Sequence, residues 1–297
     1  MTIRAELLRR VNIGTLADVT AKAISTLNLP KAGTIHAIGL EVTDSSGDAV
    51  PVATMKTELA HLTLVLGGKK IIDEISITEA FMMEQFFGAK NDVANAAGVV
   101  LYPTTLVDAV NPSQAQQFAL GTSLGLNSQG EHIRPSNLYV TVKMGSSVSS
   151  TAQVQVFAMV EDRESSPVPC VILNRLELQA ASTGYSPIRE LPYNDPNAMI
   201  RTMWIEESGT KVVSKFKLKD GKGDILEECL SSTYDQLLAY KGLTQQSGYH
   251  GISFNKYNGI YDGLDLGASV LELNPYWAGA AARGQFDLIM QKIVSKL

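Results

Sequence analysis

Apolar and polar residues alternate over short stretches along most of the chain, with a period of two residues. This pattern is typical of β-strands that have one buried face. It is clear in residues 21–29, 34–42 and 62–66. Turn-forming residues separate such stretches, for example the Asp-Ser-Ser-Gly of residues 44–47. The pattern therefore predicts many short strands joined by turns, without the alternating long helices of a parallel α/β fold.

One arrangement of strand, glycine turn, strand and helix occurs twice, over residues 61–88 and 212–242. Gly68 and Gly221 lie 153 positions apart. Both Gly67-Gly68 and Asp220-Gly221 favour a two-residue hairpin turn, because these residues accept positive φ angles. The same spacing relates three further identical pairs, which are Lys69 and Lys222, Ile72 and Ile225, and Glu74 and Glu227. The repetition predicts a duplicated domain.

A short helix is expected to follow each hairpin. Residues 76–79 (Ser-Ile-Thr-Glu) and 232–235 (Ser-Thr-Tyr-Asp) match the capping box that opens a helix. Gly88 and Gly242 then suit the left-handed residue that ends one. Each half of the chain is thus expected to carry one inserted helix.

Outside this unit, the spacing between the halves changes to 162 at Leu29-Pro30 and Leu191-Pro192, and to 131 or 132 at the last strands. Such shifts indicate insertions and deletions in loops, the largest of them in residues 103–135. A charged stretch with two prolines at residues 161–169 marks the boundary between the halves.

We therefore expect an all-β chain of two tandem eight-stranded antiparallel jelly rolls, each with a short inserted helix. The first jelly roll is predicted at residues 19–165 and the second at residues 166–297. An N-terminal amphipathic helix or arm is predicted at residues 1–18. The residues on its apolar face are Ile3, Leu7, Leu8 and Val11, with Arg4, Arg9 and Arg10 around them. That face could dock on its own or a neighbouring subunit, or lie on a membrane surface.

Composition excludes few classes of protein, but it argues against nucleic-acid binding. The 297 residues carry a net charge of −5, and neither half has the basic surplus that phosphate backbones require. The two cysteines, Cys170 and Cys229, are expected to be buried free thiols of a protein that folds in a reducing cytoplasm. No apolar run reaches the length of a membrane span, and no signal peptide is recognised.

The clearest catalytic pattern is Gly121-Thr-Ser-Leu-Gly125, which fits a nucleophile elbow with Ser123 as the nucleophile and His250 as a later partner. Its context argues against that role, because it lies in a Gly- and Ser-rich loop instead of between a buried strand and a helix. Residues 220–224 resemble a calcium loop only weakly, since Lys222 occupies a ligand position. A hairpin turn explains them better.

The histidines His36, His61, His132 and His250 lie apart and lack metal-ligand spacing. We expect no catalytic, cofactor-binding or metal-binding residues, no cofactor and no enzymatic activity. A set of aromatic residues could line a sugar-binding surface but is expected to pack in the core and loops; these are Tyr249, Phe254, Tyr257, Tyr261, Tyr276 and Trp277.

The chain resembles the double jelly-roll major capsid proteins of tailless bacteriophages with an internal membrane, of the corticovirus and tectivirus type. The resemblance lies in residues 23–42, where Leu29-Pro30 joins the first two strands, in the hairpin and helix unit of residues 62–87, and in its second copy at residues 213–240. It implies a structural role as a homotrimer, whose six jelly rolls form a pseudo-hexagonal capsomer of an icosahedral virion assembled in the host cytoplasm.

The resemblance also implies where parts of the chain lie. Residues 1–14 would face neighbouring capsomers or an inner viral membrane, and residues 103–135 would form the exposed top or a trimer contact. Other copies of the chain and vertex or minor capsid proteins would be its partners, without nucleic acid. Two other functions remain open: a carbohydrate- or receptor-binding β-sandwich that uses Trp277, as in a spike or lectin, and a hydrolase that uses Ser123.

Overall fold

The computed structural model describes most of the chain, in two compact units. Unit 1 comprises Met1–Glu84, Ala89–Asn174 and Leu297, and unit 2 comprises Gln85–Gly88 and Arg175–Lys296. The described residues are 8–51, 54–55, 59–88, 98–104, 119–146, 153–180, 184–188, 191, 196–207, 212–220, 222–254, 263–265, 272–278 and 284–297. The predicted domain limits at residues 18 and 165 stay predictions of where the duplicated halves begin and end.

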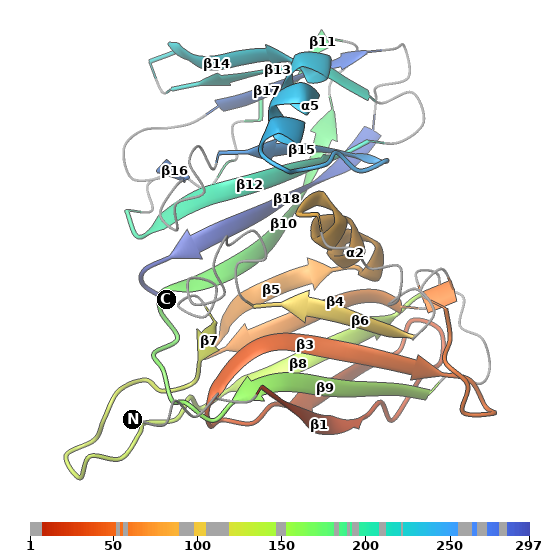
Figure 1. Ribbon diagram of the computed structural model, residues 1–297, viewed down its shortest axis with the longest axis vertical. Coiled ribbons are helices and arrows are strands. Elements are labelled where there is room, and N and C mark those ends of the chain that lie inside the picture. Colours follow the sequence, from red (N-terminus) through yellow and green to blue (C-terminus); the bar gives the residue numbers. More distant parts are fainter. Residues whose placement is uncertain are drawn as a thin grey trace. The chain divides into compact units, whose positions relative to one another are not determined.

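Unit 1 contains two layers of antiparallel strands (Figure 1). One sheet has the order β1-β9-β3-β6, and the strands of the other have the order β2-β8-β4-β5. The two-residue strand β7 (Leu120–Gly121) pairs with β3. The bounds are β1 (Arg9–Thr15), β2 (Ile24–Asn28), β3 (Thr34–Thr43), β4 (Leu59–Leu66), β5 (Lys69–Ile75), β6 (Val99–Pro103), β8 (Leu138–Met144) and β9 (Gln153–Glu161). The helix α2 (Ile77–Phe86) follows β5.

Alternation along the strands builds the core of unit 1. Ile38, Leu40 and Val42 of β3 are completely buried, as are Leu62 and Leu64 of β4. The intervening side chains of β3 point to the opposite face, because successive residues of a strand alternate. The period-two pattern of the sequence is thus confirmed in both strands.

Unit 2 repeats this plan. One sheet has the order β10-β18-β12-β15, and the other has the order β11-β17-β13-β14. The two-residue strand β16 (Leu264–Asp265) pairs with β12. The bounds are β10 (Cys170–Ala180), β11 (Gly184–Tyr185), β12 (Ala198–Glu206), β13 (Val212–Lys219), β14 (Ile225–Leu230), β15 (Tyr249–Ser253), β17 (Glu272–Ala278) and β18 (Gly284–Val294). The helix α5 (Ser231–Tyr240) follows β14.

Both units therefore share one topology. With the two-residue strands β7 and β16 set aside, the first, eighth, third and sixth strands of each unit form one sheet, and the second, seventh, fourth and fifth form the other. A helix lies between the fifth and sixth strands in both units. Two sheets connected in this way are consistent with a jelly roll. The expected mostly β architecture is confirmed, and the shared topology of the two units is consistent with the predicted double jelly roll.

The helix predicted at the N-terminus is wrong where the structure describes it. Residues Arg9–Thr15 form strand β1, which pairs with β9 from Arg9 and Val160 to Thr15 and Gln155. The reason lies in Val11 and Ile13, whose β-branched side chains alternate with polar ones and favour a strand that has a partner. The rest of the predicted helix, residues 1–7, lies outside the described residues.

The turn and cap predictions are confirmed in the first half. Gly67 and Gly68 have φ angles of 56° and 85° in the tight turn between β4 and β5. The backbone N–H of Ser76 donates to Glu79 Oε2 at 2.6 Å, and the N–H of Glu79 donates to Ser76 Oγ at 3.2 Å, which completes the capping box. Gly88 follows α2 with a φ of 79°.

Two of the matching predictions in the second half are wrong. The N-cap of α5 is Leu230, without a side-chain hydrogen bond, so Ser232 lies inside the helix and forms no capping box. The chain between β13 and β14 is a five-residue loop from Asp220 to Asp224, in which Gly223 has a φ of 89°. The loop replaces the expected two-residue turn. Gly242, with a φ of 75°, ends α5 as predicted.

Candidate functional site

Ser123 lies beside His132, a partner that its sequence motif does not indicate. Ser123 Oγ is 2.7 Å from His132 Nδ1, and its backbone N–H donates to Ser165 O at 3.0 Å. A short hairpin returns the chain from Leu126 to His132 and so brings the histidine back to the serine. His250, the partner suggested by sequence, belongs to unit 2.

The arrangement around Ser123 holds a hairpin together. A catalytic serine needs a base that a third group orients. The nearby carboxylate Glu164 is instead paired with Arg134, 2.6 Å away. The hydrogen bond from Arg134 is the main cause that lowers the pKa of Glu164, and the charge of His132 contributes least. The serine and histidine therefore fasten the base of the loop.

The other three histidines lie in three different strands. His36 Nε2 lies 2.9 Å from Glu161 Oε2, and both side chains are buried. Burial lowers the pKa of His250 to about 4, so this ring is neutral at pH 7. His61 belongs to β4. No group of three or more His, Cys, Asp or Glu side chains that could hold a metal ion occurs among the described residues.

The loop that resembled a calcium site is one of three identical turns. The Oδ1 of Asp220 accepts hydrogen bonds from the backbone N–H groups of Lys222 and Asp224, each at 2.9 Å. Asp44 and Asn127 accept the same pair of bonds in their own loops. Each loop has glycine at its fourth position and an acidic residue at its fifth. This repeated sequence pattern could have predicted all three turns.

Among the described residues, the cysteines and aromatic side chains do not form a reactive or sugar-binding group. Both thiols are free, and burial raises the pKa of Cys170 to about 12 and also raises that of Cys229. Cys170 is buried as expected, whereas Cys229 is half-buried. Trp277 is 0% exposed and packs against Phe286, so it cannot contact a sugar. Tyr276 pairs with Tyr185 at 5.0 Å between ring centroids. Tyr257 and Tyr261 lie outside the described residues.

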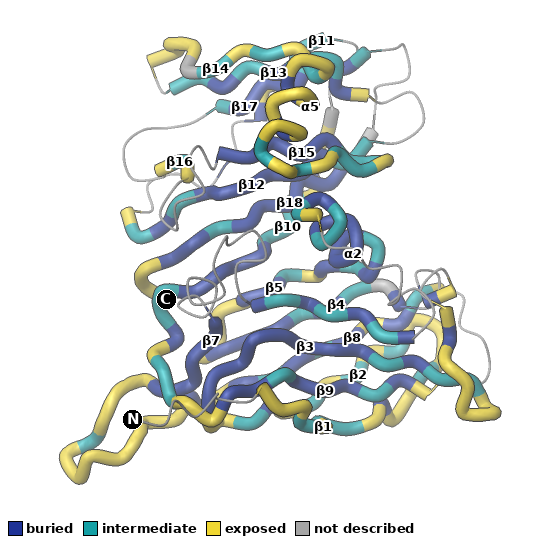
Figure 2. Tube along the Cα trace, in the orientation of Figure 1, coloured by how far each residue is buried: buried dark blue, intermediate teal, exposed yellow. Residues whose placement is uncertain are grey.

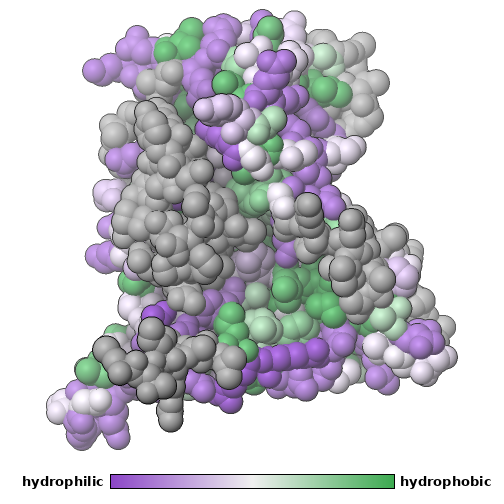
Figure 3. All heavy atoms as spheres, viewed as in Figure 1, coloured by the Kyte–Doolittle hydropathy of each residue, from purple (hydrophilic) through white to green (hydrophobic). Residues whose placement is uncertain are grey.

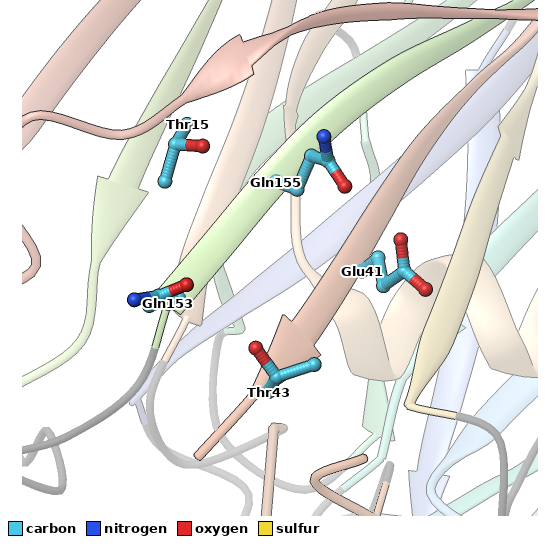
Figure 4. A pocket seen from close by; sticks show the side chains of 5 residues that line it. All are labelled: Thr15, Glu41, Thr43, Gln153 and Gln155. Carbon is cyan, nitrogen blue, oxygen red and sulfur yellow. The ribbon is translucent and has the colours of Figure 1, made fainter. Parts of the chain in front are cut away.

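A polar pocket lies on the face of β3 that points away from the core of unit 1 (Figure 4). Its volume is about 270 Å³. Thr15, Gln155 and Glu41 come from three adjacent strands and lie in one cross-strand row. Thr43 and Gln153 form the next row. Arg10 pairs with Glu41 and also donates to Gln155 Oε1 at 3.3 Å. Amides, hydroxyls and a carboxylate that is paired with Arg10 suit a ligand group that donates or accepts hydrogen bonds.

The surface around this pocket changes character from strand to strand. In the space-filling view a band of hydrophilic atoms runs where β3 and β9 lie in Figure 1, with hydrophobic atoms beside it (Figure 3). The β6 residue opposite Glu41 is Val99, which is half-buried. The pocket therefore has an apolar border on its β6 side.

The two inserted helices differ sharply in exposure (Figure 2). Both have ten residues, and each ends two residues before a left-handed glycine. Phe86, the last residue of α2, is 0% exposed, whereas its counterpart Tyr240 in α5 is 92% exposed. Met83 and Leu237, one turn earlier, are 4% and 49% exposed. A small groove of about 130 Å³ lies beside α5.

Solved structures identify the fold. The major capsid protein P2 of bacteriophage PM2 matches with a TM-score of 0.76 and 14% identity over 98% of both chains. The MCP of STIV matches at 0.65 and 15% over 97% of both. A PBCV-1 virus capsid chain matches at 0.63 and 11%, over 99% of this chain and 97% of that one. The chain has the double jelly-roll fold of viral major capsid proteins.

Sequence comparison adds no relative. No protein-family profile matches the chain, and neither does any curated protein. Among the described residues, no helix is long and apolar enough to cross a membrane.

Proposed function

We propose that this chain is a major capsid protein, a structural subunit that builds the shell of an icosahedral virion. The observation that carries the proposal is the pair of jelly rolls with one strand order in one chain, which matches capsid proteins over nearly its whole length. The arrangement of Ser123 and of the histidines offers no competing chemistry. The burial of Trp277 also argues against the lectin-like role that was suggested for it.

In this proposal each half is an eight-stranded jelly roll, and three copies form a pseudo-hexagonal trimer. Two units of one topology support it, because a trimer then presents six similar domains around a ring. Trimers contact one another and vertex or minor capsid proteins in a shell assembled in the host cytoplasm, without binding nucleic acid. In this proposal, residues 1–14 face neighbouring capsomers or an inner membrane.

Sedimentation and electron microscopy of the purified protein test this function. We expect a trimer by analytical ultracentrifugation, and pseudo-hexagonal particles in negatively stained images. Source particles should show the same units in their shell. A protein that stays monomeric at micromolar concentrations and forms no such particles would refute the proposal.

A further inference from the structure

We propose that the exposed end of α5, with Leu237 and Tyr240, docks on the polar pocket of a second copy of this chain. The partner surface is the row of Thr15, Gln155 and Glu41 with its apolar border at Val99. The inference rests on the proposed function as a trimeric capsid protein, and it names the residues that join one subunit to the next.

The end of α2 packs within unit 2. Gln85–Gly88, at the end of α2, belongs to unit 2. There Phe86 meets Trp204 of β12 edge-to-face, with 5.6 Å between ring centroids. Phe86 also lies over Gly251 of β15, where an added Cβ would come within 2.4 Å of the ring. The N–H of Thr244 donates to Phe86 O at 3.0 Å.

The pairing of the strands identifies the face on which this aromatic residue lies. Trp204 and Gly251 are directly paired neighbours on β12 and β15. The adjacent residue His250 packs against Phe216 of the other sheet, so it faces the interior of the unit. Because residues alternate along a strand, Trp204 and Gly251 face away from that interior. The end of α2 thus covers the outer face of the third and sixth strands of unit 2.

The corresponding third and sixth strands of unit 1 are β3 and β6. Ile38, Leu40 and Val42 face the core of unit 1. Glu41 therefore lies on the outer face, directly opposite Val99 of β6. The pocket beside Glu41 therefore lies on the face of unit 1 that corresponds to the covered face of unit 2.

The end of α5 corresponds to the end of α2. Tyr240 takes the position of Phe86 but is 92% exposed, and Leu237 takes that of Met83 and is 49% exposed. Tyrosine is enriched in protein interfaces and among the residues that contribute most to binding. In a ring of copies, α5 of one copy would repeat on the next copy the contact that the end of α2 makes within unit 2. Such head-to-tail contacts form a ring when the rotation between successive copies closes.

The chemistry of each helix end fits its receiving surface. Phe86 is wholly apolar and meets Trp204 and a glycine. Tyr240 carries a hydroxyl, and the surface proposed for it offers the amide of Gln155 and the carboxylate of Glu41 beside the apolar Val99. A tyrosine ring packs on apolar groups while its hydroxyl finds a hydrogen-bond partner. The difference between the two aromatic residues follows the difference between the two faces.

Cysteine cross-linking tests the contact directly. In a Cys229→Ser background, Tyr240→Cys combined with Thr43→Cys should give disulfide-linked dimers and trimers under mild oxidation. The matched control combines Thr43→Cys with Lys222→Cys, an exposed position in the loop after β13, and should give none. Cys170 is buried and stays reduced.

Substitution tests the strength of the contact. Tyr240→Ala should raise the concentration at which half of the trimer dissociates by about tenfold or more, as expected for a central interface residue. Tyr240→Phe should raise this concentration by less, because it removes only the hydroxyl and its hydrogen bond. Ile24→Ala, at another exposed apolar residue, should change nothing. Because Tyr240 is exposed, the thermal unfolding midpoint of the dissociated chain should not move with its substitution.

The two proposals fail in different ways. If the wild-type protein is a monomer, the capsid function fails. If the wild type is a trimer, but Tyr240→Ala dissociates at the same concentration and the Tyr240→Cys pair does not cross-link, only the contact proposed here is overturned.

Discussion

Phe157 lies so close over Gly39 that a Cβ added to the glycine would come within 2.1 Å of the phenyl ring. Both residues belong to the sheet of unit 1 that carries the polar pocket, where β3 and β9 pair Gly39 with Phe157 directly. The guanidinium of Arg10 covers the ring at 4.2 Å from its centroid. The ring is therefore held between a glycine and a cation.

Gly39→Ala should destabilise the protein by about 1–3 kcal/mol, because the ring must leave its place to admit a methyl group. Urea unfolding followed by circular dichroism measures the change. Gly39→Ala combined with Phe157→Leu should recover part of the loss, since the smaller side chain leaves room for the methyl group. An unchanged midpoint for Gly39→Ala alone would contradict the packing described.

Ser76→Ala should cost about 1 kcal/mol, because it removes the N-terminal cap of α2. Ser232→Ala is its matched control, as this serine is exposed inside α5 and caps nothing. Denaturant midpoints of the two variants give the comparison. Equal losses at both positions would show that the capping box of α2 adds no stability.

Protonation of His250 should lower the free energy of unfolding below neutral pH. Its folded-state pKa of about 4 lies below the ordinary value of 6.5, so the unfolded state binds the proton more readily. The stability from a neutral His250 is complete above about pH 6.5 and falls as the pH drops towards 4, by about 3 kcal/mol at most.

The measurement for His250 is the slope of unfolding free energy against pH between 6.5 and 4. His250→Gln should show a shallower slope than wild type, whatever its absolute stability. A wild-type NMR titration should place the imidazole pKa well below 6. Parallel slopes for the two proteins would mean that this histidine does not titrate as its burial requires.

Ser123→Ala should leave ester hydrolysis unchanged at the background rate and lower stability by about 1 kcal/mol, the cost of one lost hydrogen bond. Hydrolysis of p-nitrophenyl acetate by wild type, Ser123→Ala and His132→Ala measures the first effect. Turnover that disappears in both variants would revive the hydrolase hypothesis and count against a purely structural pair.

The sequence predicted the parts of the fold that local patterns determine. Alternating residues located β3 and β4, and glycines with positive φ marked the end of each helix. The other parts of the fold depend on pairing between strands that are distant in sequence, which local patterns do not show. Arg9–Thr15 fits a helix until β9 supplies its hydrogen-bond partner.

The proposed docking surface was harder to predict than the fold. The polar pocket combines Thr15, Glu41 and Gln155, which lie far apart in the chain and come together only through strand order. Tyr240 was recognisable as part of a helix, but its exposure depends on what packs against that helix. The pairing of Ser123 with His132 likewise required the hairpin between them.

The three identical turns can change in sequence at one position without losing their backbone conformation. In each turn, one side chain at the first position and the glycine at the fourth define the backbone. The exposed side chains of Ser46, Gln129 and Lys222, at the third position, contribute none of these bonds. Replacement there leaves the turn intact, and exposed loop tips also tolerate insertions. The three loops are thus places where the surface of this protein can change in sequence, or accept an inserted peptide, at little cost to folding.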